Sequence, residues 1–177
     1  MSGEQIRTAI QGAVEYLSQH PTEARYTDSA ATAVLEGGLR CRVVGKNSDI
    51  ATTDMPTSVG GGGSAPSPGW LFRAAQASCV ATLIAMHAAV QGVSLTRLEV
   101  SVDSESDDRG ILGMDESIPA GPVSGRIRVV IAADGVPQDK LRQLVEWADR
   151  HCPVTDAVRR AVPLRLEVDV AAPKTVR

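Results

Sequence analysis

The sequence predicts an α+β fold with a mostly antiparallel sheet and one long buried helix. Residues 70–91 contain 16 apolar side chains in 22 positions, too many for a helix with a single buried face. Two segments, residues 98–103 and 164–170, alternate apolar and polar residues, which is typical of half-buried strands. The predicted order is helix, hairpin, long helix, strands, helix and strand, and this order favours the α+β class.

Residues 4–18 predict a short amphipathic helix. Four apolar residues recur there at spacings of four, four and three, which places them on one helical face. They are Ile6, Ile10, Val14 and Leu17. Glu4 is acidic, and no basic region followed by an uninterrupted apolar run is present, so the segment does not resemble a secretory signal. We expect a cytoplasmic protein with an N-terminal helical extension over residues 1–30.

Residues 31–44 predict a β-hairpin. Branched apolar residues flank Gly37 and Gly38, where the chain is expected to turn, and Cys41 falls on the second strand. The following stretch, residues 52–69, contains four consecutive glycines and three prolines, which exclude regular structure. We therefore expect a linker or a loop that wraps closely around another part of the molecule.

The apolar helix over residues 70–91 is expected to be buried on every side. A membrane span is the competing interpretation, but alanine is frequent and four polar residues interrupt the run. These four are Arg73, Gln76, His87 and Gln91. A chain of this size can hardly enclose such a helix alone, so the pattern predicts a homodimer in which a second copy covers it.

The C-terminal half alternates strands with one helix. Residues 95–106 and 126–133 predict two strands with a loop between them, and Pro137 opens a helix with one apolar face. Pro153, directly after Cys152, must break or restart that helix. Residues 164–170 predict the last strand.

Charge and composition exclude several classes of function. The 177 residues include 18 basic and 21 acidic side chains, a net charge of -3, and the basic residues are scattered along the chain. A nucleic-acid partner or an anionic membrane surface is therefore not expected. Aromatic residues make up only 3% of the chain, too few to line a pocket for a large cofactor, so no cofactor is expected.

The three cysteines, Cys41, Cys79 and Cys152, are too few for a disulfide scaffold. Cys79 lies inside the apolar helix and Cys152 at the helix break. Each is either a packing residue or a reactive thiolate, because a nearby cation or a helix start favours ionisation. Cys41 is interpreted as a packing residue. Neither a Cys-x-x-Cys motif nor paired histidines occur, so no metal site is expected.

Four sequence elements follow one another in a specific order. A glycine-rich loop leads to Pro68, which precedes the helix-borne Cys79 by eleven residues, and then come LEVSVDSESDDRGILG and HCPVTDAV. In this order and spacing they resemble the OsmC/Ohr (osmotically inducible and organic hydroperoxide resistance) family of thiol peroxidases. The resemblance assigns residues 31–172 to one OsmC-like domain and residues 173–177 to a tail.

The resemblance implies an intertwined α+β homodimer with its active sites at the dimer interface. By position, Cys79 would be the peroxidatic thiol and Cys152 the resolving thiol, the latter expected to be the more accessible one at its helix break. Arg40 is the closest match to the arginine that favours the thiolate, with Arg25 and Arg42 as alternatives. The implied substrate is an organic hydroperoxide, and the implied reductant is a dithiol such as a lipoyl protein, in defence against oxidative stress.

One departure from the family pattern affects the expected site. Members of the family carry a glutamate directly after the loop proline, where it orients the arginine, whereas this chain has Gly69. The loss of such a positioning group commonly costs about ten- to a hundredfold in activity. Glu36 and Asp54 are both open as substitutes. A second hypothesis is therefore a non-peroxidatic member that binds a small apolar ligand or acts as a redox sensor.

Overall fold

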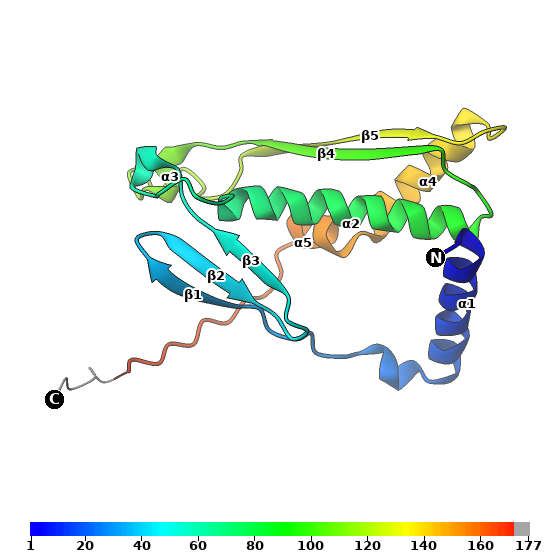
Figure 1. The fold of residues 1–177 in the computed structure, drawn as a ribbon, viewed down its shortest axis with the longest axis horizontal. Helices are drawn as coiled ribbons and strands as arrows, with labels where there is room; N and C mark the ends of the chain where they lie inside the picture. The colour runs from blue at the N-terminus through cyan, green and yellow to red at the C-terminus, as the bar shows by residue number, and fades with distance from the viewer. Residues whose placement is uncertain (172–177) are drawn as a thin grey trace.

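The computed structural model describes residues 1–171 of the chain, which form two antiparallel sheets and several helices (Figure 1). The elements follow in this order: α1 (Gly3–Gln19), the 3₁₀ helix η1 (Pro21–Ala24), β1 (Thr32–Gly37), β2 (Arg40–Val44), β3 (Ile50–Thr53), the 3₁₀ helix η2 (Thr57–Val59), α2 (Pro68–Val90), β4 (Arg97–Glu105), α3 (Asp108–Ile111), β5 (Ser124–Ala132), α4 (Gln138–His151) and α5 (Pro153–Arg159). The predicted α+β class with antiparallel sheets is confirmed.

The first sheet has the order β1-β2-β3 and is built on the predicted hairpin. Gly38 in its turn has φ 54°, a left-handed conformation that glycine adopts without steric cost. β3 was not predicted from the sequence, because a four-residue strand next to the glycine-rich stretch is too short to reveal an alternation. β3 pairs with β2 and places Thr53 opposite Cys41. The hairpin stands away from the main body, since β1 is exposed along its whole length.

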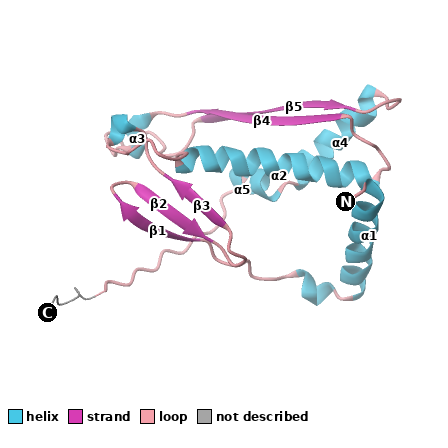
Figure 2. Ribbon diagram, in the orientation of Figure 1, coloured by secondary structure: helices cyan, strands magenta, loops and turns pink. Residues whose placement is uncertain are grey.

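The second sheet is the long ribbon of β4 and β5, which runs alongside α2 (Figure 2). β4 alternates between half-buried and exposed residues, as predicted. Its apolar face meets α2 and α4 in one cluster with four fully buried members. These are Val80, Ile84, Ala148 and Cys152. The core therefore lies between the ribbon and the two helices, and Cys152 forms part of it.

The beginning and the end of α2 are encoded locally. The Ser67 hydroxyl accepts a hydrogen bond from the Trp70 N–H (3.2 Å), and Pro68 occupies the first turn, where its missing N–H has no cost. At the other end Gly92 has φ 66°, and the Val93 N–H reaches back to the Ala88 carbonyl (2.8 Å). The predicted helix is thus confirmed within two residues at its start and one at its end.

Within the single chain α2 is not buried on every side, which agrees with the expectation that this chain alone cannot enclose it, and its burial by a second copy stays a prediction. Five of its residues are buried: Gln76, Val80, Ile84, Ala88 and Ala89. The ribbon, α4 and α5 cover only part of its circumference, so that Trp70 stays about half exposed (51%). By length and composition alone α2 could cross a membrane, a test that the core helix of a soluble protein also passes.

The predicted last strand over residues 164–170 is wrong for the single chain. The segment has no secondary structure, and its apolar side chains are exposed, with Leu164 at 93% and Val170 at 91%. It extends away from α5 as an irregular segment (Figure 1). The alternation is typical of a strand, but a strand forms only when it pairs with another strand. Among the described residues of this chain, no strand pairs with the segment. The tail over residues 173–177 lies outside the described residues.

Candidate functional site

Cys79 and Cys152 come together from two distant parts of the chain. Cys79 lies in the middle of α2, and Cys152 lies at the junction of α4 and α5, where Pro153 opens the second helix. Cys152 belongs to the fully buried cluster, and Cys79 packs against that cluster. Both thiols are free. The structure thus places in contact the two cysteines that the sequence singled out.

Cys152 is the buried thiol of the pair, whereas the sequence analysis expected it to be the more accessible one. Its exposed fraction is 0%, and Cys79 is partly exposed. The reason is local: the chain does not open into a loop after His151, because α5 starts at Pro153 and folds back against α2. Access to the pair from solvent is therefore through Cys79.

The two thiols differ in their tendency to ionise. Burial raises the pKa of the Cys79 thiol, and its hydrogen bond with Cys152 raises it further. Burial also opposes ionisation of Cys152, but hydrogen bonds from the Thr155 hydroxyl and N–H, and then from Cys79, outweigh it and lower the pKa of Cys152. A positive charge next to Cys79 would favour its thiolate form against the effect of burial.

Two buried polar residues support this pair and were not identified from the sequence. The Gln76 Nε2 donates to the Thr155 Oγ1 (3.4 Å), and the Thr155 N–H donates to the Cys152 sulfur (3.5 Å). Both residues are buried. The available signal was a glutamine three residues before Cys79, a spacing that places it on the same side of the helix. Its hydrogen bond connects α2 to the start of α5.

A cavity of about 280 Å³ lies beside Gln76 and Thr155. Its wall is largely apolar and is made by Phe72, Val102, Ile127 and Val158. Arg73 and Arg159 contribute cationic groups to the lining. The volume is close to the lower end of the range for small-molecule sites. A mainly apolar ligand with a polar group therefore fits this lining, which includes neither cysteine but is connected to Cys152 through Thr155.

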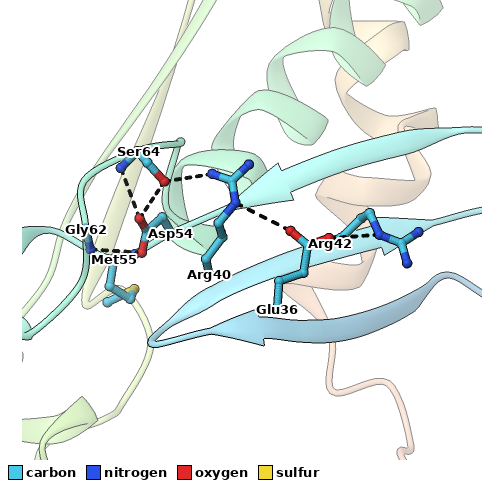
Figure 3. Close-up of polar contacts among 7 residues, drawn as sticks. All are labelled: Glu36, Arg40, Arg42, Asp54, Met55, Gly62 and Ser64. Atoms are coloured by element: carbon cyan, nitrogen blue, oxygen red, sulfur yellow. Dashed lines mark hydrogen bonds and ion pairs between the residues drawn. The ribbon is translucent and has the colours of Figure 1, made fainter.

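Arg40 lies in a separate polar network on the hairpin and the glycine-rich loop (Figure 3). Its Nη1 donates to the Ser64 Oγ (2.7 Å), and its Nε lies 3.4 Å from the Glu36 Oε2. The other Glu36 oxygen pairs with the Arg42 Nε (3.0 Å). Among the described residues, the polar partners of Arg40 do not include either cysteine.

Asp54 holds the loop side of this network (Figure 3). Its carboxylate accepts hydrogen bonds from the Ser64 N–H (3.0 Å) and hydroxyl (2.8 Å), and from the N–H groups of Met55 (2.8 Å) and Gly62 (3.3 Å). Both substitutes that the sequence left open therefore reach Arg40. Glu36 pairs with Arg40 directly, and Asp54 is connected to Arg40 through the Ser64 hydroxyl. Ser64 was not identified from the sequence.

The remaining candidates lie elsewhere. Cys41 is on β2, Gly69 is in the first turn of α2, and Arg25 follows η1. His87 and His151 both stack on the Trp147 ring, with centroid separations of 3.9 and 4.1 Å. Within residues 1–171, no group of three or more His, Cys, Asp or Glu side chains is arranged to hold a metal ion.

Replacing Asp54 with asparagine is expected to destabilise the protein in a pH-dependent way. Hydrogen bonds from Ser64 lower the pKa of Asp54 to about 2 in the folded state, below the unfolded value of about 3.9. A lowered folded pKa contributes stability that is present above about pH 4 and is lost as the pH falls towards 2. Urea unfolding of the wild type and Asp54→Asn should therefore differ at pH 7 and converge near pH 2.

The control is Asp28→Asn, an equivalent change at an exposed position for which no hydrogen bond to the side chain is recorded in the described structure. Its unfolding midpoint should follow the wild type at both pH values. A constant gap between the wild type and Asp54→Asn from pH 7 to pH 2 would show that the carboxylate charge does not stabilise the loop.

Comparisons with known proteins find similarity over most of the chain. The family model described as OsmC-like protein matches residues 61–167. Organic hydroperoxide resistance proteins of Xanthomonas axonopodis pv. citri and Xanthomonas campestris pv. phaseoli are each 30% identical over 152 residues, which cover 82% of this chain and 96% of the relative.

Solved structures share the fold. The OsmC-like protein of Mycoplasma pneumoniae has a TM-score of 0.65 at 13% identity and covers 77% of this chain and 91% of its own. The organic hydroperoxide resistance protein OsmC of Legionella pneumophila has a TM-score of 0.56 at 24% identity, with 76% and 91% covered. At these identities the likeness concerns the fold alone.

Proposed function

The chain belongs to the OsmC-like protein family, and we propose that it is a cytoplasmic thiol-dependent peroxidase that reduces organic hydroperoxides. The observation that carries the proposal is the contact between Cys79 on α2 and the buried Cys152 at the start of α5, next to a largely apolar cavity. A thiol pair of this kind suits peroxide reduction, because the second thiol can remove the oxidised form of the first.

The proposed reaction proceeds in three steps. The Cys79 thiolate attacks the terminal oxygen of the hydroperoxide, the O–O bond breaks, and an alcohol leaves after its alkoxide takes up a proton. The Cys152 thiolate then attacks the sulfur of the Cys79 sulfenic acid, so that a disulfide forms and hydroxide is displaced, which takes up a proton and leaves as water. An external dithiol, such as a lipoyl protein, supplies two electrons and two protons and restores both thiols.

We also propose that the working unit is a homodimer. β1, part of α2 and the segment over residues 164–170 all leave apolar side chains exposed in the single chain. So much exposed apolar surface is typical of an interface. A second copy would cover these regions and could supply the positive charge that the Cys79 thiolate requires.

A second candidate function is ligand binding or redox sensing without peroxide turnover. The observation that favours it is the raised pKa of Cys79, together with Gly69 in place of the family glutamate. A thiol that stays protonated reacts slowly with peroxide. The cavity would then hold an apolar ligand that is not consumed.

Counting free thiols after exposure to a peroxide separates the two functions. Mixing the reduced protein with one equivalent of cumene hydroperoxide is expected to remove two of the three thiols of each chain, because one turnover ends in the disulfide. The Cys41→Ser variant is the control and should lose both of its thiols at the same rate. An unchanged thiol count would contradict the peroxidase and favour the second candidate.

A further inference from the structure

Arg73 lies on α2 between two cavities. It lines both the 280 Å³ cavity beside the thiol pair and a second hollow of about 430 Å³ under the glycine-rich loop. Its Nη1 donates a long hydrogen bond to the Ser104 Oγ of β4 (3.4 Å). Among the described residues it forms no ion pair, whereas the other arginine of the first cavity, Arg159, is paired with Asp149 (2.8 Å). Arg73 thus presents a positive charge that no carboxylate neutralises.

Gly69 has no side chain, so the space next to the Arg73 guanidinium, where a carboxylate could pair with it, is empty of protein side chains from this position. A Cβ atom at position 69 would lie 3.8 Å from the Arg73 Nη1 and 3.9 Å from the Ser67 Oγ, which are ordinary contact distances. Its φ is outside the left-handed region, so the backbone does not require glycine. A glutamate there would be four residues before Arg73 on the same helix, a favourable spacing for an ion pair.

The carboxylates that line the two cavities are already engaged. Asp54, on the side of the loop, accepts hydrogen bonds from Ser64 and from the backbone. Asp103, on the side of the thiol pair, is bonded to the Arg126 Nη2 (2.8 Å). Neither forms an ion pair with Arg73, so an anion that binds Arg73 must come from outside the described chain.

The groups that line the 280 Å³ cavity suit a ligand with a carboxylate at one end and an apolar chain. The Arg73 guanidinium contributes the cationic group that has no carboxylate partner among the described residues, and Phe72 and Ile127 belong to the apolar wall. Gln76 and Thr155 connect the cavity to Cys152. A carboxylate with an apolar chain places its charge on the guanidinium and its chain against the wall. A guanidinium binds a carboxylate through two parallel hydrogen bonds, which adds both strength and orientation.

We propose that Arg73 is a specificity-determining residue that binds the carboxylate of an amphipathic ligand, in the space that Gly69 leaves open. Arg73 then selects carboxylate-bearing hydroperoxides over neutral ones. The identification of the ligand as a hydroperoxide rests on the proposed function, but the recognition of a carboxylate does not, because it can be measured with a ligand that cannot oxidise a thiol.

The test compares octanoate with 1-octanol as probes, with binding to the reduced full-length protein measured by calorimetry. Octanoate should bind the wild type about ten- to a hundredfold more tightly than octanol, the range for a charge-assisted hydrogen bond. Arg73→Gln should lose this preference, and Arg73→Lys should retain part of it. Equal affinity of Arg73→Gln and the wild type for octanoate would overturn the proposal, as would the absence of octanoate binding to the wild type.

Two substitutions at position 69 provide a matched pair that leaves Arg73 in place. Gly69→Glu should remove the preference for octanoate, because the new carboxylate pairs with Arg73, while the isosteric Gly69→Gln should keep most of it. Equal octanoate affinities of these two variants would contradict the assignment of Arg73. The two proposals also fail separately: octanoate binding without thiol loss to cumene hydroperoxide removes only the peroxidase, and thiol loss without octanoate binding removes only the role of Arg73.

Discussion

Replacing Cys79 with serine is expected to abolish the consumption of organic hydroperoxides, a loss of about a thousandfold or more in rate. A serine hydroxyl is not ionised near neutral pH and cannot form a sulfenic acid, so no group remains that can attack the O–O bond. The assay is the disappearance of cumene hydroperoxide in the presence of a dithiol. Full activity of Cys79→Ser would eliminate the peroxidatic assignment.

Cys152→Ser should fail in a different way. Cys79 can still react once, but no thiol is then in contact with its sulfenic acid, so the oxidised form accumulates or is oxidised further. Mass spectrometry should detect added oxygen on the peptide that contains Cys79. An intramolecular disulfide in this variant would instead implicate Cys41, which lies on β2 outside the thiol pair.

The electrostatics of the pair add a condition to this mechanism. Within one chain the Cys152 sulfur accepts a hydrogen bond from the Thr155 N–H, whereas burial raises the pKa of the Cys79 thiol, so the first step needs a group that favours the Cys79 thiolate. A guanidinium next to Cys79 would do this, since an opposite charge within about 4–6 Å favours ionisation. We expect a second copy to supply this charge, and Arg40, already oriented by Glu36 and Ser64, is suited to do so.

Much of the fold was predictable because its signals are local. The apolar run of α2, the alternation of β4 and the proline after Cys152 each determine an element through neighbouring residues alone. The contacts Gln76–Thr155 and Ser64–Asp54 were not predictable, because each joins residues that only the folded chain brings together. The site was anticipated through its cysteines, whereas its buried support was not.

The exposed apolar faces of α2 and of residues 164–170 have a common explanation. Hydrophobic patterns report that a face must be covered, but they do not report which chain covers it. The α2 helix and the segment over residues 164–170 both carry more apolar surface than this chain buries. Both surfaces agree with the homodimer proposed above, in which a second copy would cover them.

Replacing Leu166 and Val168 together with serine is expected to dissociate the proposed homodimer. Both side chains are exposed in the single chain and lie on the same side of an alternating segment. Burial of a Val or Leu side chain contributes about 1.5–3 kcal/mol, so the double change in two chains removes up to about 6–12 kcal/mol. If only half of the lower value is lost, the dissociation constant still rises by about a hundredfold.

The measurement is light scattering at micromolar concentration, where the wild type should have about twice the chain mass of 18.6 kDa and the variant should approach that mass itself. The matched control is Glu167→Ser with Asp169→Ser, which alters the polar side of the same segment and should leave the dimer intact. A wild type that is folded and monomeric under these conditions would refute the homodimer. Dissociation of both variants to the same extent would show that the apolar side of the segment is no more important for the dimer than its polar side.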